Sequence, residues 1–253
     1  MTDIAIRHHQ IPLASMPQGI SPLRIAQLSD FHFRHWTRLL DRLQRRLARM
    51  TFDLLALTGD FSQHPRDGRH AARLLCRFLE PIRPPLGCYA VAGNHDAAIL
   101  ADTLADGPVS FLRNESVEVR RNGHAVNIAG LDDGVRSVAD LPKTLAGCRN
   151  GRLTILLCHL PSTHRHLPDG VVDLVLSGHT HAGQWRLPWL GCLKVNDRIS
   201  REQIHGLHRI GPRWLHVTAG VGASGPFHFR INCPSEIALL TLTRPTAHNV
   251  AVP

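Results

Sequence analysis

Five short motifs in this sequence carry carboxylate, amide and imidazole groups, the side chains that bind hard or borderline divalent metal ions. Each motif is weak by itself, because an Asp-x-His triplet or a Gly-Asp pair often occurs by chance or in a turn. Together, in order and each directly after a strand-like run, they predict one shared site. The motifs are Asp30-Phe31-His32, Gly59-Asp60, Gly93-Asn94-His95-Asp96, Cys158-His159 and Gly178-His179-Thr180-His181.

These motifs supply more ligands than one small metal ion takes, which predicts two ions that share a carboxylate. Two such ions lie about 3.5–4 Å apart, polarise a bridging water into hydroxide and clamp the oxygens of a phosphoryl group during in-line displacement. The charges agree, since two divalent ions bring +4 and the carboxylates of Asp30 and Asp60 remove 2. The remaining positive charge suits an anionic phosphate and its transition state, and the neutral Asn94 preserves it.

The motifs follow short apolar runs that are typical of buried strands. In open α/β sheets, ligands bind beyond the carboxyl ends of the strands, so these runs are expected to deliver their polar residues to one place. Helical spacing over 36–50 and 69–79 puts a helix between successive runs and indicates a layered α/β fold. The runs cover 24–29, 54–58, 88–92, 153–158 and 171–177.

Two other segments have a recognisable pattern. The helix expected over 36–50 has an apolar face that packs on a sheet in our main interpretation; the alternative is a basic amphipathic helix resting on an anionic membrane. Strand-like runs over 116–121 and 125–129 flank Asn122-Gly123, a type I′ turn signal that predicts a hairpin. Further strand-like runs cover 214–218 and 236–242.

The 253 residues carry a net charge of +9, and nearly all of the basic residues are arginine. A basic surface favours anionic partners, although arginine-rich usage also follows from codon bias, and both interpretations stay open. Basic stretches interleaved with aromatic residues are absent from the sequence, which argues against nucleic acid as a partner.

Cysteine usage and hydropathy bear on the compartment. The six cysteines form no CxxC pair, which is typical of reduced thiols in a cytosolic protein. No apolar run approaches the roughly 20 residues of a membrane helix, and residues 1–23 hold no stretch typical of a signal peptide. We therefore expect a cytoplasmic protein, with peripheral contact to the inner membrane as a variant of this expectation. One domain over 1–253 is expected, with 1–22 as an N-terminal extension or edge segment.

Through the five motifs, which span positions 30–181, the chain resembles the calcineurin-like metallophosphoesterase superfamily. The resemblance implies an α/β fold, a four-layer sandwich of two mixed β-sheets flanked by helices, with a dinuclear metal site at the carboxyl ends of the strands. It also implies hydrolysis of a phosphodiester or pyrophosphate bond by in-line attack of a metal-bridging hydroxide.

The resemblance implies a role for each site residue as well. His95 would face the substrate, stabilise the transition state and protonate the leaving oxygen, and Asp96 would orient His95. The two metal ions are expected to be Mn, although the same ligands bind Fe or Zn. Asp30, His32 and His181 would hold the first ion, Asn94, His159 and His179 the second, and Asp60 would bridge them.

The last third of the chain narrows the resemblance. Residues 181–188, 219–225 and 230–237 are similar to a bacterial group that contains membrane-associated phosphodiesterases and pyrophosphohydrolases of UDP-2,3-diacylglucosamine in lipid A synthesis. This lipid-linked nucleotide is therefore the first expected substrate, and contact with an anionic membrane is expected with it. The alternatives are a soluble nucleotide, nucleic acid or phosphoprotein as substrate, or a non-catalytic scaffold. The sequence does not predict the oligomeric state.

Residues beyond the motifs give weaker signals. Arg34, His64 and His164 are candidates for substrate contact, against the plain alternative of surface or loop residues. The glycine-rich stretch 220–225 either cradles a phosphate through its backbone amides or forms a tight turn. Asp132-Asp133 ends another strand-like run and either braces the site or is purely structural. Three tryptophans suit an acyl chain or a membrane, or else the core: Trp36, Trp185 and Trp189.

Overall fold

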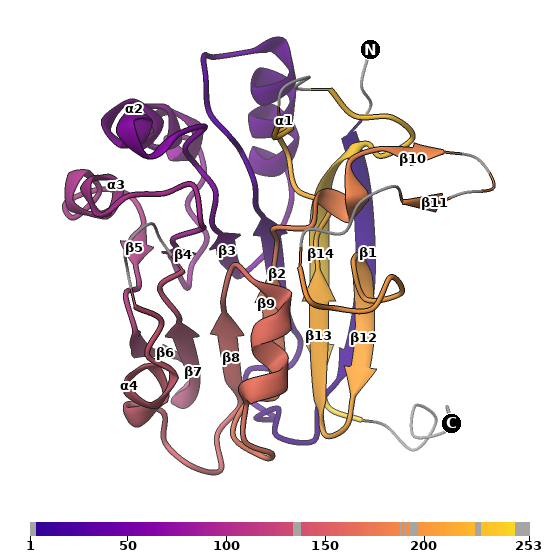
Figure 1. The fold of residues 1–253 in the computed structure, drawn as a ribbon. Helices are drawn as coiled ribbons and strands as arrows, with labels where there is room; N and C mark the ends of the chain where they lie inside the picture. Colours follow the sequence, from indigo (N-terminus) through magenta and orange to yellow (C-terminus); the bar gives the residue numbers. More distant parts are fainter. Residues whose placement is uncertain are drawn as a thin grey trace.

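The computed structural model describes residues 4–133, 138–187, 189, 191–192, 197–225 and 229–245. These residues form two six-stranded sheets that lie face to face (Figure 1). A two-stranded ribbon of β10 (Arg186–Leu187) and β11 (Gly191–Cys192) lies apart from them. Among the described residues, no helix is both long enough and apolar enough to cross a bilayer.

The first sheet has the strand order β1-β14-β2-β3-β4-β5. From β2 to β5 the neighbouring strands are parallel, β14 runs antiparallel to β2, and β1 pairs in parallel with β14 at the edge. The three central parallel strands therefore end at the same edge of the sheet. The strands are β1 (Ile4–Pro12), β2 (Leu23–Leu28), β3 (Leu54–Thr58), β4 (Cys88–Val91), β5 (Ser110–Phe111) and β14 (Ser235–Thr243).

The second sheet has the order β12-β13-β9-β8-β7-β6. Its four inner strands are parallel, and β12 and β6 are antiparallel at the two edges, so this sheet is mixed as well. The strands are β6 (Glu115–Arg121), β7 (His124–Gly130), β8 (Thr154–Leu157), β9 (Leu174–Ser177), β12 (Gly206–Ile210) and β13 (Arg213–Val217).

Helices cover the outer face of each sheet, which confirms the expected four-layer sandwich. Alternation along β3 shows the layering: Leu55 and Leu57 pack towards the helices, whereas Leu54 and Ala56 join the core between the sheets. The first sheet is covered by α1 (Arg38–Ala48), α2 (Gly68–Leu79) and α3 (Ala98–Thr103), and the second by α4 (Leu141–Ala146) and the 3₁₀ helix η2 (Pro161–His166).

The predicted elements are present with small shifts of their bounds. The apolar face of α1 is used by the core, because Leu40, Leu43 and Leu47 are buried against the first sheet. The helix begins after Thr37, whose hydroxyl accepts the N–H of Leu40 at 3.2 Å. The run over 171–177 becomes a shorter strand, since β9 starts at Leu174.

The predicted hairpin joins β6 to β7. Asn122 and Gly123 both have positive φ, 51° and 77°, which is the conformation that a type I′ turn requires at its two central positions. The Asn122 amide also donates to the carbonyl of Gly19 at 3.0 Å and so ties the turn to the N-terminal segment.

Truncation of Val126 tests the core between the sheets. The side chain of Val126 lies on β7 and is fully buried there. Val126→Ala should lower the free energy of unfolding by about 2 kcal/mol, because two methyl groups leave the core and a cavity remains. Val138→Ala makes the same truncation at a residue that is 81% exposed. This control should change the free energy of unfolding by about 0.5 kcal/mol or less. Urea titration of both variants measures the difference, and equal losses would contradict the two-sheet core.

Candidate active site

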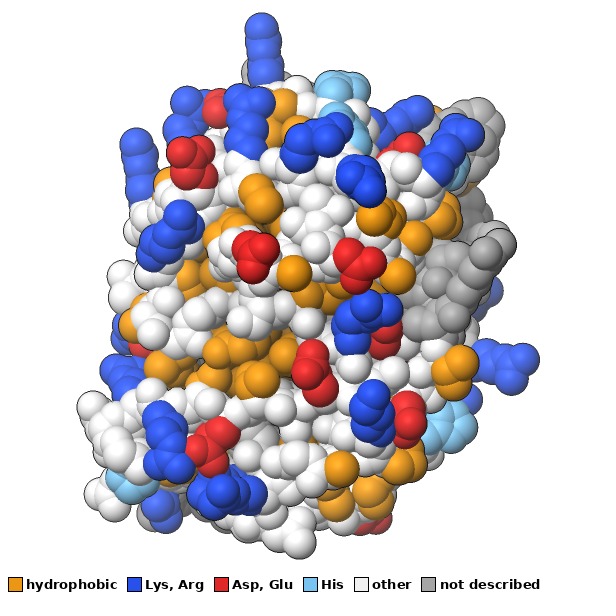
Figure 2. Space-filling model, turned by 90° about the vertical axis from the view of Figure 1, so that its left-hand side faces the viewer, with side chains coloured by type: hydrophobic (Ala, Val, Ile, Leu, Met, Phe, Trp, Pro, Cys, Tyr) orange, Lys and Arg blue, Asp and Glu red, His pale blue; other side chains and the backbone are white. Residues whose placement is uncertain are grey.

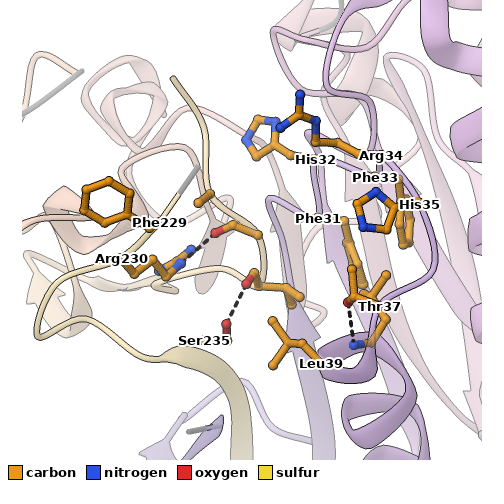
Figure 3. A pocket seen from close by; sticks show the side chains of 14 residues that line it. Phe31, His32, Phe33, Arg34, His35, Thr37, Leu39, Phe229, Arg230 and Ser235 are labelled. Atoms are coloured by element: carbon orange, nitrogen blue, oxygen red, sulfur yellow. Dashed lines mark hydrogen bonds between the residues drawn. The ribbon is translucent and has the colours of Figure 1, made fainter. Parts of the chain in front are cut away.

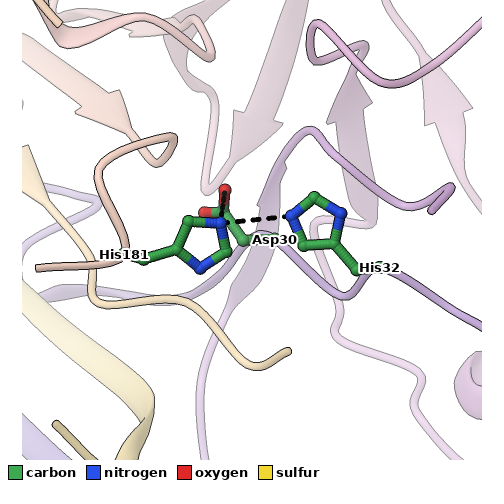
Figure 4. A group of neighbouring side chains, drawn as sticks. All are labelled: Asp30, His32 and His181. Carbon is green, nitrogen blue, oxygen red and sulfur yellow. Dashed lines mark hydrogen bonds and ion pairs between the residues drawn. The ribbon is translucent and has the colours of Figure 1, made fainter. Parts of the chain in front are cut away.

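Three side chains with metal-binding groups meet just beyond β2 and β9. The Nε2 atoms of His32 and His181 lie 3.1 Å apart, and Asp30 Oδ1 lies 3.5 Å from His181 Nε2 (Figure 4). One ligand atom from each of the three residues lies within 4.8 Å of the others, and all three residues are buried. We call these residues the first cluster.

A second cluster lies beyond β3, β4 and β8. His159 Nε2 is its centre, at 3.1 Å from Asn94 Oδ1, 3.2 Å from His179 Nδ1 and 3.3 Å from Asp60 Oδ2. His159 is fully buried, whereas Asn94 is exposed. The second cluster is therefore reached by solvent on the side of Asn94.

The carboxylate of Asp60 is shared by the two clusters. Its Oδ2 lies 3.6 Å from His32 Nε2 and 3.3 Å from His159 Nε2. The other oxygen, Oδ1, accepts the backbone N–H of His95 at 2.8 Å. This is the position that a bridging ligand needs.

Backbone carbonyls set the tautomers of two histidines. His159 Nδ1 lies 2.8 Å from the carbonyl of Thr58, and His32 Nδ1 lies 3.3 Å from that of Ser62. A carbonyl only accepts, so Nδ1 of each ring donates to it and Nε2 is the nitrogen that faces the cluster. Metal-binding histidines are oriented in this way. Ring nitrogens and carboxylate oxygens converge here within 3.1–3.6 Å of one another, and such oxygen and nitrogen donors suit Mn, Fe or Zn.

The pKa values show where the centre holds positive charge. Burial lowers the pKa of His32 to about 4 and that of His181 well below its ordinary value, so both rings are neutral near pH 7. Burial raises the pKa of Asp30 to about 6. Burial opposes the protonation of His159 too, yet the carboxylate of Asp60 raises the pKa of that ring to about 10. The carboxylate of Asp60 therefore favours positive charge at His159.

Five candidate ligands have left-handed backbone conformations, which are uncommon for residues other than glycine and cluster at functional sites. This conformation turns the chain sharply, so a short loop can direct each side chain inward at the end of its strand. The residues are Asp30, His32, Asp60, His179 and His181, with φ between 46° and 68°.

Two motif glycines permit the close approach of neighbouring loops. A Cβ on Gly93 would overlap Oδ1 of Asp60, and a Cβ on Gly178 would overlap Ser29 and Asp30. Any side chain at these positions would push a ligand-bearing loop outward. The glycine in each motif is thus required by packing around the two clusters.

His95 lies at the open side of the centre. Its ring meets that of His32 edge-on, with centroids 4.9 Å apart, and is partly exposed. The carbonyl of Gln63 accepts the Nδ1 proton at 2.9 Å. This contact leaves Nε2 as the nitrogen of His95 that can exchange a proton.

Asp96 is expected to orient His95, and in the structure the hydrogen bond to the His95 ring comes from the Gln63 carbonyl, whereas Asp96 contacts backbone. The buried carboxylate of Asp96 accepts backbone N–H groups of Ser62 at 2.8 Å, Gly93 at 3.0 Å and Phe61 at 3.2 Å. These bonds join the segments that follow β3 and β4. Asp96 therefore positions backbone, and through it Asp60, rather than an imidazole.

The weaker candidates are placed apart from one another. Arg34 is exposed and lines a cavity together with His32. His64 is exposed and precedes the 3₁₀ helix η1 (Pro65–Asp67). His164 is buried in η2, which lies on β9 and β13, and its carbonyl accepts from Arg213. Arg34 thus shares a cavity with His32 of the first cluster.

The glycine-rich stretch forms a turn that supports the first cluster. The N–H of Val221 donates to the carbonyl of Ser29 at 2.9 Å, and the N–H of Gly222 donates to that of Asp30 at 2.7 Å. These amides are therefore used by the backbone at the end of β2, which excludes them from a phosphate cradle.

Two residues that contact the centre, Arg230 and Asp133, lie outside the five motifs. Arg230 Nη2 lies 3.2 Å from His181 Nδ1, and its Nε donates to the Gly222 carbonyl at 2.6 Å. Arg230 lies in the segment 230–237 that supports the family resemblance, and this was the only available signal. Asp133 braces the fourth motif, since its carboxylate accepts the N–H groups of His159 and Leu160.

Two adjacent clusters with metal-binding groups, at the carboxyl ends of strands from two mixed sheets, define an α/β metallohydrolase. The chain belongs to the calcineurin-like phosphoesterase family, whose sequence model matches residues 23–183 and so includes both clusters and His95. Members of this family depend on two metal ions and hydrolyse phosphoester bonds, and the chain is a hydrolase of this class.

Relatives with similar sequences include three bacterial proteins. Metallophosphoesterase YkoQ of Bacillus subtilis is 30% identical over 224 residues, which cover 85% of this chain and 82% of YkoQ. UDP-2,3-diacylglucosamine pyrophosphatase LpxG of Chlamydia trachomatis is 30% identical over 276 residues, with 86% and 83% covered. Phosphodiesterase YaeI of Escherichia coli is 26% identical over 257 residues, with 94% and 87% covered.

A solved structure shares the fold. Haemophilus influenzae NAD nucleotidase superposes with a TM-score of 0.50 at 13% identity, over 79% of this chain and 46% of that enzyme. At this identity the similarity concerns the fold alone.

Removal of the shared charge tests the two clusters. Protein loaded with Mn²⁺ and desalted should keep about two ions per chain, and Asp60→Asn should keep fewer than one, because both clusters lose their common anion. Asp106→Asn makes the same change at an exposed carboxylate and should keep the wild-type content. Elemental analysis by mass spectrometry measures all three. Full metal content in Asp60→Asn would overturn the shared-ligand arrangement.

Asp96→Asn separates the two roles considered for Asp96. An amide has one acceptor oxygen and turns its NH₂ towards N–H groups, so the free energy of unfolding should fall by about 1–3 kcal/mol and the metal content should fall with it. Thermal unfolding and elemental analysis give the two readouts. If Asp96 acted only by orienting His95, turnover would fall while stability and metal content stayed at wild-type values.

Proposed function

We propose that this chain hydrolyses the pyrophosphate bond of UDP-2,3-diacylglucosamine, a step of lipid A synthesis. The observation that carries the hydrolytic part is the position of Asp60 between two clusters whose candidate ligand atoms converge. The substrate part is supported by the similarity to LpxG, a pyrophosphatase of this nucleotide, at 30% identity over most of both chains.

Each cluster is proposed to hold one divalent cation, for which Mn²⁺ is our first choice because all donors are oxygen or nitrogen. Two such ions, when bound, polarise the attacking water and neutralise the phosphoryl oxygens. Asp60 would be the shared ligand, and the neutral Asn94 would keep the net charge of the centre positive towards an anionic substrate. The other proposed ligands are Asp30, His32 and His181 in the first cluster and Asn94, His159 and His179 in the second.

His95 is proposed to act on the leaving oxygen. Its Nδ1 is held by the Gln63 carbonyl, so Nε2 is the nitrogen that would donate a proton as the bond to phosphorus breaks. Its partly exposed position beside His32 and Asn94 puts this nitrogen on the side from which a substrate reaches the centre.

The domain organisation and location follow from the same proposal. Both sheets supply ligands, which supports one catalytic domain over 1–253 in which neither sheet acts alone. A substrate with acyl chains resides in a membrane. This supports a location of the enzyme in the cytoplasm, at the surface of the inner membrane.

Other substrates remain as a second candidate. The phosphodiesterase YaeI is a relative as well, and a soluble phosphodiester would use the same clusters. Nucleic acid is less favoured, because the sequence lacks basic stretches interleaved with aromatic residues. Over the middle and lower part of the face shown in Figure 2, acidic side chains lie among the basic ones. A non-catalytic scaffold is disfavoured by the complete set of candidate ligands.

The substrate is tested with protein that is stripped by a chelator and reloaded with Mn²⁺. We expect release of UMP from UDP-2,3-diacylglucosamine, and Asp60→Asn in the same preparation serves as the inactive control. Cleavage of bis(p-nitrophenyl) phosphate without release of UMP would keep the hydrolytic chemistry and refute the lipid nucleotide. Cleavage of neither compound by the metal-loaded protein would refute both parts.

His95→Ala tests the proton donor. Turnover of phenyl phosphodiesters should fall about 10²- to 10⁴-fold, because phenolate leaves poorly without a proton. The loss should be smaller for p-nitrophenyl phosphodiesters, whose leaving group is stable as an anion. His8→Ala, at an exposed histidine of β1, is the control and should behave as wild type. Equal losses for both leaving groups, or loss of bound metal, would contradict the proposed role.

A further inference from the structure

A cavity of about 340 Å³ opens beside the first cluster, between the segment after β2 and the segment that leads into β14 (Figure 3). Its volume lies in the range of about 300–1,000 Å³ that is usual for small-molecule sites. The wall is largely apolar. Six large hydrophobic side chains line it: Phe31, Phe33, Leu39, Leu40, Val221 and Phe229.

The cavity is continuous with the candidate metal centre through two residues. His32 lines it, and the Nε2 of the same ring faces His181 at 3.1 Å. Arg230 lines it from the opposite side, and its Nη2 lies 3.2 Å from His181 Nδ1 (Figure 3). A molecule whose phosphate lies at the first cluster is therefore within reach of the cavity with its remaining part.

Two arginines, Arg34 and Arg230, lie beside the apolar wall. Arg34 and His35 are exposed and belong to the lining, and Arg230 adds a guanidinium next to His181. The combination of an apolar interior with arginines near its opening complements an amphiphile whose anionic group stays outside while its hydrocarbon part is buried.

We propose that this cavity binds one hydrocarbon chain of the phosphate-bearing substrate. The inference rests on the phosphoester chemistry of the proposed function and specifies the apolar part of the substrate. It also places the acyl site in this cavity rather than at the tryptophans that the sequence suggested. Trp36 stacks under Arg77 at 4.0 Å and packs on the first core, so it is not part of the cavity lining. Trp185 stacks on Phe229, which lines the cavity, with ring centroids 5.4 Å apart.

A series of p-nitrophenyl alkyl phosphodiesters tests the proposal independently of the nucleotide. The leaving group stays constant while the alkyl chain grows from methyl to decyl, at concentrations below micelle formation. Each buried methylene should raise kcat/KM roughly three- to fourfold, so the decyl ester should exceed the methyl ester by ~100-fold or more if four methylenes are buried. A wild-type ratio near one would overturn the proposal.

Ala223→Phe fills the cavity, because Ala223 belongs to its lining. The ratio of decyl to methyl kcat/KM should fall at least tenfold in this variant. Ala146→Phe adds the same ring to an exposed residue of α4 and should keep the wild-type ratio. Leu39→Gln, which makes one wall polar, should lower the ratio too and serves as the second variant if Ala223→Phe does not fold, as judged by circular dichroism and metal content.

The outcomes distinguish this proposal from the proposed function. A high decyl ratio that both cavity variants abolish supports the chain site, even if UMP is not released from UDP-2,3-diacylglucosamine. A high ratio that neither variant lowers would place the chain elsewhere and overturn the inference. Release of UMP together with a flat chain-length series would leave the proposed function standing and refute the cavity as its acyl site.

Discussion

The buried charge of Asp60 is the constraint on which the rest of the centre depends. An ion that loses its water costs several kcal/mol unless other groups compensate it, and Asp60 is only 2% exposed. One oxygen receives the N–H of His95, and the other faces ring nitrogens of both clusters. Gly93 leaves room for the carboxylate, and Asp96 ties together the two segments that carry these groups. The same charge that is costly to bury is what makes the site attractive to cations.

The two sheets must keep a constant separation for the clusters to meet. A buried polar network below the centre links them. Gln27 on β2 donates to the carbonyl of Ser177 on β9 at 2.9 Å, and its oxygen lies 2.7 Å from His216 Nδ1 on β13. Gln27 also reaches Thr58 at the end of β3. Buried polar groups are tolerated only when they are hydrogen-bonded, so this network favours one relative position of the strand ends.

The centre also concentrates backbone strain. Left-handed conformations at five candidate ligands would destabilise an isolated loop, and here the surrounding hydrogen bonds impose them. Asp30, for example, accepts the N–H of His179 with its carboxylate while its own carbonyl accepts from Gly222. The rigid loops keep the ligands in place before a cation or a substrate arrives, which lowers the reorganisation that catalysis would need.

The sequence by itself determined the strands, the helices between them, the hairpin at Asn122-Gly123 and the set of polar residues that meet, because these depend on local periodicity, turn chemistry and the rule that parallel strands end at one edge. The sequence did not determine which atoms are hydrogen-bond partners of the site residues. The partner of His95 is a carbonyl of Gln63, and Asp96 binds backbone instead. His164 lies in η2 rather than at the clusters, and the apolar cavity forms where residues near 31–40 meet residues near 221–235. Backbone carbonyls are the same in every residue, so a sequence pattern does not show which of them a side chain will meet. Contacts between segments about 190 residues apart depend on how the sheets pack. Only the tertiary structure therefore decided these partners and the cavity.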